Sequence, residues 1–137
     1  MALIGCQAPD PELIPDERLQ AELGLTEKDR VHTIELHTGI GERAEPDSLD
    51  LPSGDFVQFV STDWLVHEVR FELDSLGIDA RRFLENTGQE ASPPLLQREA
   101  RFVLTFEDAP PGRYPYRLAG NRAGGRGVII VPPPGGR

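Results

Sequence analysis

Metal-binding chemistry depends on few residues in this chain. Its 137 residues include three histidines, one cysteine and one methionine, Met1. His32 and His37 lie five positions apart in a β-prone segment, so they face opposite sides of a strand and cannot bind one ion together without a bend. His67 lies in residues 66–72, where apolar and charged side chains alternate. This alternation predicts a strand with His67 on its apolar face.

The single cysteine, Cys6, excludes a disulfide within the chain and a cysteine-rich zinc site. The sequence Leu-Ile-Gly-Cys at positions 3–6 resembles the lipobox of bacterial lipoproteins, whose cysteine becomes the lipidated first residue. Only five residues precede Cys6, and they hold neither a basic segment nor a long apolar one. Two alternatives remain open: a lipid anchor whose signal begins upstream, or a free thiol in a polar N-terminal tether at residues 1–12.

The hydrophobic pattern predicts a mainly β domain. Gly 14 and Pro 13 divide the chain into short segments, which suits an all-β architecture better than a helical one. The expected strands are 31–36, 48–51, 56–60, 66–72, 101–106, 113–118 and 127–131, and short helices are expected at about 15–23 and 78–86. The last strand is a continuous apolar run and is expected to be buried on both faces.

The order of these segments resembles the cupredoxin pattern of plastocyanin and amicyanin, from about residue 48 to residue 131. The matching segments are the Gly-Asp turn at 54–55, the strand at 56–60, the polar break at 61–63, His67, residues 111–116 and the strand at 127–131. The resemblance implies an all-β, Greek-key β-sandwich with one or two short helices. It also implies that His67 is the first copper ligand and that the loop before the last strand carries Cys, His and Met ligands.

The copper ligands that the resemblance implies are mostly absent. With amicyanin-like spacing, the Cys position falls on Leu118, the second His on Asn121 and the axial Met near Gly125. Only His67 matches. A blue-copper site needs a Cys thiolate and two imidazoles, and a leucine in place of that cysteine would fill the empty site with apolar volume. His67 is either a remnant ligand or, as we favour, a neutral histidine that donates to a backbone carbonyl under the loop.

The charge of the chain is unevenly distributed. The 14 basic and 23 acidic residues give a net charge of −9, which disfavours nucleic acid as a partner. Residues 111–137 contain five Arg and no acid, which leaves −14 for residues 1–110. The implied fold brings Arg122 and Arg126 to the loop end, with Arg117 and Asn121 close by. We expect this surface to bind an acidic protein or a small anion; the alternative is that the arginines are ordinary loop residues paired with acids.

No catalytic constellation is visible in the sequence. Ser61 and Ser92 lie outside any nucleophile motif, and the Gly-rich loop at 120–127 leads into a strand, whereas a phosphate-binding loop would lead into a helix. We therefore predict a non-enzymatic, copper-free binding or scaffold domain at residues 13–131, with a tail at 132–137. It is expected outside the bacterial cytoplasm, in the periplasm, with membrane attachment only through Cys6. The alternative is a copper-binding or electron-transfer protein that uses His67 with atypical ligands.

Overall fold

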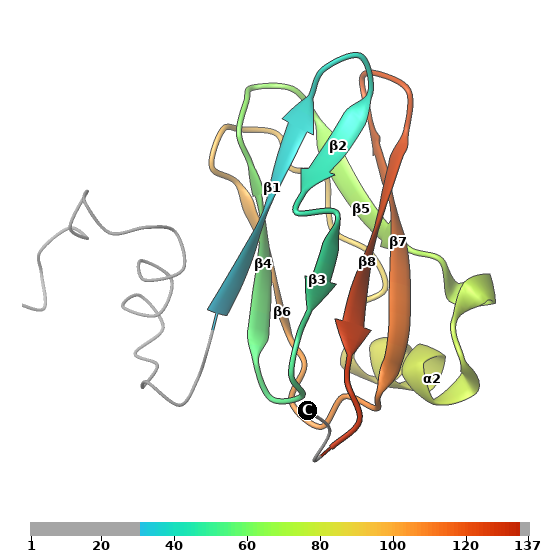
Figure 1. Ribbon diagram of the computed structural model, residues 1–137. Coiled ribbons are helices and arrows are strands. Elements are labelled where there is room, and N and C mark those ends of the chain that lie inside the picture. The colour runs from blue at the N-terminus through green and yellow to red at the C-terminus, as the bar shows by residue number, and fades with distance from the viewer. Residues whose placement is uncertain (1–30, 135–137) are drawn as a thin grey trace, which may run out of the picture.

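The computed structural model describes residues 31–134, which form two β-sheets packed face to face (Figure 1). In the first sheet the strand order is β2 (Glu42–Glu45), β1 (Val31–Thr38), β4 (Phe56–Ser61) and β6 (Arg101–Thr105). In the second sheet it is β3 (Ser48–Asp50), β8 (Gly125–Val131), β7 (Gly112–Gly120) and β5 (His67–Phe71). The pairs β1–β4 and β3–β8 are parallel and the other neighbours are antiparallel. The predicted all-β sandwich is confirmed.

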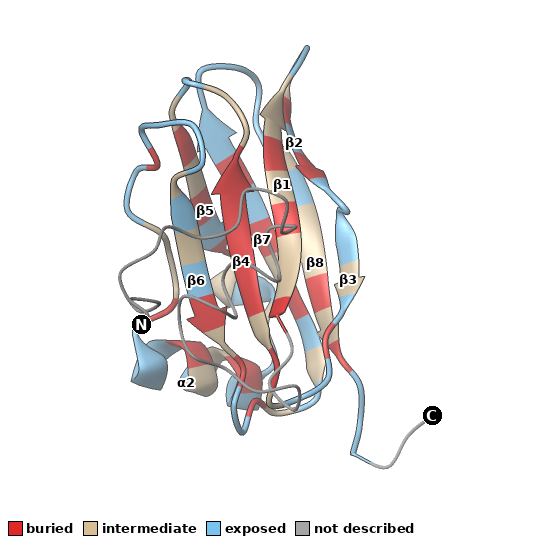
Figure 2. Ribbon diagram, turned by 90° about the vertical axis from the view of Figure 1, so that its left-hand side faces the viewer, coloured by how far each residue is buried: buried red, intermediate tan, exposed pale blue. Residues whose placement is uncertain are grey.

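The core between the sheets is rich in aromatic side chains. Phe59, Phe106, Tyr114 and Tyr116 are fully buried. Phe59 and Tyr116, from opposite sheets, meet edge to face with ring centroids 5.1 Å apart, a favourable aromatic geometry. Figure 2 shows β4 buried along almost its whole length, as expected for the apolar run at 56–60.

A short helical region follows β5 and lies at the lower end of the sandwich (Figure 1). It comprises the 3-10 turn η2 (Leu73–Ser75) and the helix α2 (Ile78–Thr87), which confirms the helix predicted at 78–86. Ala80 and Leu84 are four residues apart and form its buried face. Gly88 caps the C-terminus of the helix in a left-handed conformation (φ 68°). Its N–H donates to the carbonyl oxygens of Leu84 and Glu85 in the last turn.

Two features of the strands differ from the prediction. The strand β2 was not expected, because its four residues contain one apolar side chain, Ala44. The strand β8 is not buried on both faces: Ile129 and Val131 are buried, whereas Val128 and Ile130 are half-buried. These two half-buried residues lie on the outer face of the second sheet, because strand residues alternate between faces.

Several expectations concern residues outside the described range. Cys6, the tether at 1–12 and the helix at 15–23 precede residue 31, and the last three residues of the expected tail follow residue 134. Within residues 31–134 there is no helix long and apolar enough to cross a membrane.

Candidate functional site

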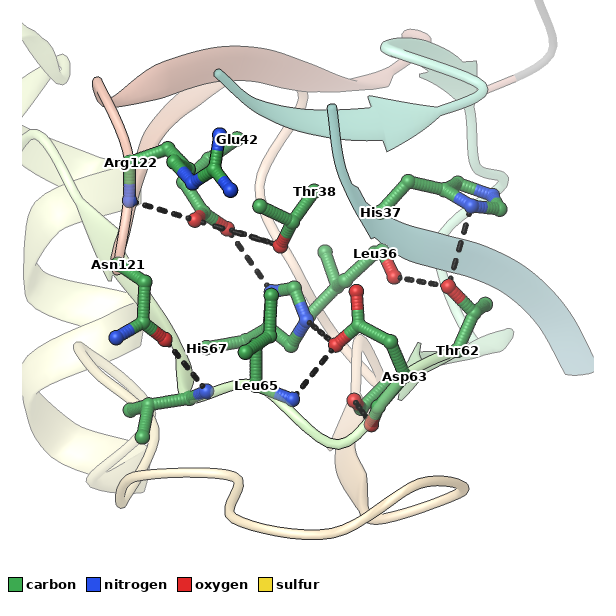
Figure 3. Close-up of polar contacts among 12 residues, drawn as sticks. Leu36, His37, Thr38, Glu42, Thr62, Asp63, Leu65, His67, Asn121 and Arg122 are labelled. Atoms are coloured by element: carbon green, nitrogen blue, oxygen red, sulfur yellow. Dashed lines mark hydrogen bonds and ion pairs between the residues drawn. The ribbon is translucent and has the colours of Figure 1, made fainter. Parts of the chain in front are cut away.

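His67 begins strand β5 at one end of the sandwich, where its register partner is Gly120 of β7. The residue is 2% exposed. Its ring lies between two carboxylates, with Nδ1 3.0 Å from Oε1 of Glu42 and Nε2 2.8 Å from Oδ1 of Asp63 (Figure 3). Both ring nitrogens are therefore engaged in hydrogen bonds, and neither offers a free lone pair to a metal ion. The partners are carboxylates, and the backbone carbonyl expected from the sequence is not among them.

Glu42 enters this cluster from the start of β2, and 1% of its side chain is exposed. Its carboxylate accepts hydrogen bonds from the backbone N–H of Arg122 at 3.3 Å and from the hydroxyl of Thr38 at 3.4 Å. Its own N–H donates to the carbonyl of Ala123 at 2.7 Å. Burial of a carboxylate requires polar partners that replace water. Here they come from the β1–β2 hairpin, from β5 and from the β7–β8 loop, so Glu42 holds these three segments together.

Asp63 completes the cluster from the segment that follows β4. Its Oδ1 also accepts a hydrogen bond from the backbone N–H of Leu65 at 2.9 Å. Burial by itself raises the pKa of Asp63, but the hydrogen bonds from His67 and Leu65 and the electrostatic interaction with the His67 ring outweigh burial. The pKa of Asp63 therefore lies below its usual range, and the group is held as a carboxylate against the ring.

The three other positions implied as copper ligands lie at the same end of the sandwich. Leu118 is 4% exposed and belongs to the hydrophobic core. Asn121 accepts a hydrogen bond at 3.1 Å from the backbone N–H of the residue before β5, which fastens the loop to that strand. A Cβ at Gly125 would overlap the carbonyl oxygen of Glu42, and one at Gly120 would lie 2.6 Å from the Glu42 carboxylate. Glu42 therefore fills the space that side chains at these two positions would need.

Two of the predicted arginines are direct neighbours. Arg117 of β7 lies opposite Arg126 of β8, with their Nε atoms 3.4 Å and 3.5 Å, respectively, from Oε2 of Glu72. Across its other edge, β7 pairs with β5, and there Arg117 lies opposite Arg70. We call Arg70, Arg117 and Arg126 the arginine row. Because like charges at directly opposed positions destabilise a sheet, Glu72 offsets part of the repulsion within the row.

Arg122 lies beyond the row, on the exposed loop between β7 and β8 (Figure 3). Within residues 31–134 its guanidinium forms no ion pair, although its backbone N–H binds Glu42. An open depression of about 520 Å³ adjoins the row; Arg70, Glu72, Arg81 and Arg117 contribute to its lining. The arginines of the predicted cationic surface therefore differ in pairing. Arg117 and Arg126 share the acid Glu72, as expected if they are ordinary paired arginines, whereas the Arg122 guanidinium forms no ion pair within residues 31–134.

The remaining histidines both belong to β1. His32 binds a carboxylate oxygen of Asp55 at 2.9 Å, and His37 lies near the other end of β1. The three histidines thus do not converge on one point.

The sequence analysis missed Glu42, Asp63 and Arg70. Hydrophobic periodicity assigns charged residues to the solvent side, so it gives no signal for a buried glutamate. The spacing of four between Asp63 and His67, across a turn, was the signal available for that contact. Arg70 was assigned to a solvated strand face, and only the register of β5 against β7 reveals its place in the row.

The structure belongs to the class of two-sheet β-sandwiches. A buried histidine and the loop between β7 and β8 lie at one end of it. No family model and no curated protein matches the sequence. Among solved structures, the chain is similar to a Cu-containing nitrite reductase from Thermus scotoductus, with 25% identity and a TM-score of 0.54 over 75% of this chain and 22% of that one.

Two smaller copper proteins are also similar. Oxidised plastocyanin from Dryopteris crassirhizoma has 19% identity and a TM-score of 0.53, over 72% of this chain and 98% of that one. A Cu(I) form of an amicyanin variant has 20% identity and a TM-score of 0.50, over 80% of this chain and 87% of that one. The chain therefore has the cupredoxin fold, as the sequence predicted.

Proposed function

We propose that this protein is a copper-free cupredoxin-like binding domain, non-enzymatic, that binds an acidic protein or a small anion at the arginine-bearing end of its second sheet. The observation that carries the first part is the position of His67. Its two nitrogens face Glu42 and Asp63 at 3.0 Å and 2.8 Å, so a copper ion would have to displace a carboxylate. Displacement would leave a buried charge without its partner, which is costly.

The ligand set supports the same proposal. A blue-copper centre needs a thiolate, and the implied Cys position holds the buried Leu118. The sulfur atoms of the chain belong to Met1 and Cys6, both outside the described residues. The alternative, copper binding through His67 with nitrogen and oxygen ligands, would use a ring nitrogen that the carboxylates already occupy.

The charge pattern supports the choice of partner. The arginine row crosses β5, β7 and β8 near the turn of the β7–β8 hairpin, and Arg122 lies in that turn. Guanidinium groups bind carboxylates and phosphates through paired hydrogen bonds. The excess of acids in residues 1–110 would repel an acidic partner from other parts of the chain and so favour approach at the arginines.

A location outside the bacterial cytoplasm extends the proposal. It is supported by the lipobox-like residues that end at Cys6. Metabolic labelling with a fatty-acid analogue tests it: the native protein is expected to take up the label and a Cys6→Ser variant to take up none. Failure of the native protein to take up label would remove the lipid anchor from the proposal.

A calorimetric titration with Cu(I) and Cu(II) tests the loss of the copper site. We expect no tight copper binding that depends on His67. The matched comparison is between His67→Ala and His32→Ala, which remove a buried and a half-buried imidazole, respectively. Tight one-to-one binding that His67→Ala abolishes and His32→Ala leaves intact would overturn the proposal and favour copper handling.

Charge reversal tests the contact surface. The probe is poly-glutamate, and its binding is measured at increasing salt concentration. We expect Arg122→Glu combined with Arg126→Glu to weaken binding and to flatten its dependence on salt. The control is Arg82→Glu, an exposed residue of α2 that belongs to neither strand of the β7–β8 hairpin. Equal binding by the double variant and the control would contradict the assignment of the surface.

A further inference from the structure

A second group of potential ligands lies on the outer face of the first sheet. Glu35 and His37 are two residues apart on β1 and so share a face, and Glu45 of β2 lies directly opposite Glu35. Nε2 of His37 is 3.2 Å from Oε1 of Glu35 and 3.5 Å from Oε1 of Glu45. One donor atom from each of the three side chains lies within 4.8 Å of the others.

The two acids of this group repel each other. Like charges at directly opposed strand positions destabilise a sheet. Arg43 offsets this only weakly, since its guanidinium lies 4.0 Å from Glu45 and both side chains are 64% exposed. A cation held between the acids would turn this repulsion into attraction.

The tautomer of His37 is set by a residue outside the group. Oγ1 of Thr62 lies 2.7 Å from the carbonyl oxygen of Leu36 and 3.1 Å from Nδ1 of His37 (Figure 3). The hydroxyl has one proton, and the carbonyl can only accept, so the shorter bond uses that proton. Nδ1 of His37 must then donate to Thr62. In the neutral ring this leaves the lone pair on Nε2, the nitrogen that faces the two glutamates.

We propose that Glu35, His37 and Glu45 form a binding site for a divalent transition-metal ion, with Zn²⁺ as the representative. One imidazole and two carboxylates are ligands that zinc accepts, and a hydrogen bond to the other ring nitrogen is the usual way in which proteins orient a ligating histidine. Exposure of the two glutamates leaves the remaining coordination positions to water or to a group from a partner. The site lies on the opposite face of the β1–β2 hairpin from Glu42 and is independent of the proposed function.

A calorimetric titration with Zn²⁺ tests the site. The full-length Cys6→Ser protein is used, so that no thiol competes. One ion per chain is expected, and His37→Gln and Glu45→Gln should each weaken binding by about tenfold or more. The control is His32→Gln, which removes another half-buried imidazole from the same strand. Absence of binding, or binding that His37→Gln leaves unchanged, would overturn the proposal.

The positioning role of Thr62 gives a second test. Thr62→Val keeps the shape of the side chain but removes the hydroxyl, and it should weaken Zn²⁺ binding by about tenfold, whereas Thr62→Ser should restore it. Circular dichroism establishes that the variants fold. Nitrogen NMR of the Zn²⁺-loaded protein should show the proton of His37 on Nδ1 and the metal on Nε2. Metal on Nδ1 would contradict the arrangement.

Discussion

His67 lies between two carboxylates at one end of the sandwich. An imidazole binds a metal through a nitrogen lone pair, and here a carboxylate oxygen lies within 3.0 Å of each ring nitrogen. A buried ring also needs polar partners, because an unpaired buried polar group is costly. Glu42 and Asp63 provide these partners. The cluster therefore joins β5 to the β1–β2 hairpin and to the segment that follows β4.

Acid should weaken this cluster through Asp63. Because its folded pKa is lowered, Asp63 contributes stability above its unfolded value of about 3.9, and this contribution is lost as the pH falls through the folded value. Urea unfolding between pH 7 and pH 3 should therefore show a steeper loss of stability in the native protein than in Asp63→Asn. Asp50→Asn, at an exposed position of β3, is the control and should behave as the native protein. Parallel curves for the native protein and Asp63→Asn would contradict the prediction.

Removal of the hydroxyl group from each of two buried tyrosines should change the stability of the protein by different amounts. Tyr114 donates to the carbonyl of Pro110 at 2.7 Å, and burial raises its pKa to about 12. The hydroxyl of Tyr116 is buried without a hydrogen-bond partner among residues 31–134, and burial raises its pKa as well. Tyr114→Phe should lower the free energy of unfolding by about 1 kcal/mol, whereas Tyr116→Phe should leave it unchanged or raise it by up to about 1 kcal/mol. Denaturant unfolding measures both, and a larger loss in Tyr116→Phe would show that its hydroxyl is bonded.

At the scale of the elements, the sequence was informative where side chains alternate between apolar and charged. The segment at 67–71 has this pattern, and its burial in the structure follows it residue by residue. The strand β2 could not be predicted, because its inward positions are Glu42 and Ala44 and only one of them is apolar. The arginine row could not be predicted either, because it depends on how β5, β7 and β8 are aligned, and the hydrophobic pattern does not determine that alignment.

Loss of the Glu42 carboxylate should disconnect elements that the sheets alone do not join. Glu42→Ala leaves Nδ1 of His67 and the N–H of Arg122 without an acceptor, and we expect it to lower the free energy of unfolding by about 3 kcal/mol or more. Glu42→Gln keeps an acceptor and should cost less. Hydrogen exchange at Arg122 should rise in Glu42→Ala. Glu45→Ala changes an exposed glutamate of the same strand and is the control. Equal stability of the two alanine variants would contradict the linking role.

The whole fold was more predictable from the sequence than its site. The spacing of turns, strands and His67 was enough to predict a cupredoxin-type sandwich, because most of the strands carry a local signal of their own. Leu118, the apolar residue at the implied Cys position, could be identified from the sequence, but Glu42 and Asp63 beside His67 could not. Glu42 and His67 lie 25 positions apart, and nothing local to either residue indicates that they meet.

Because the whole molecule is negatively charged, stabilisation by an added anion tests specifically for binding at the arginine row. With a net charge of −9, the chain as a whole repels anions, so a specific gain in stability requires a local cluster of cations. Phosphate stabilises most proteins through general exclusion; the informative quantity is therefore the difference between variants. At matched ionic strength, replacing chloride by phosphate should raise the unfolding midpoint more in the native protein than in Arg126→Gln. Arg82→Gln, on α2, should respond as the native protein does. Equal shifts in all three proteins would show that the row does not bind the anion and would leave an acidic protein as the partner to seek.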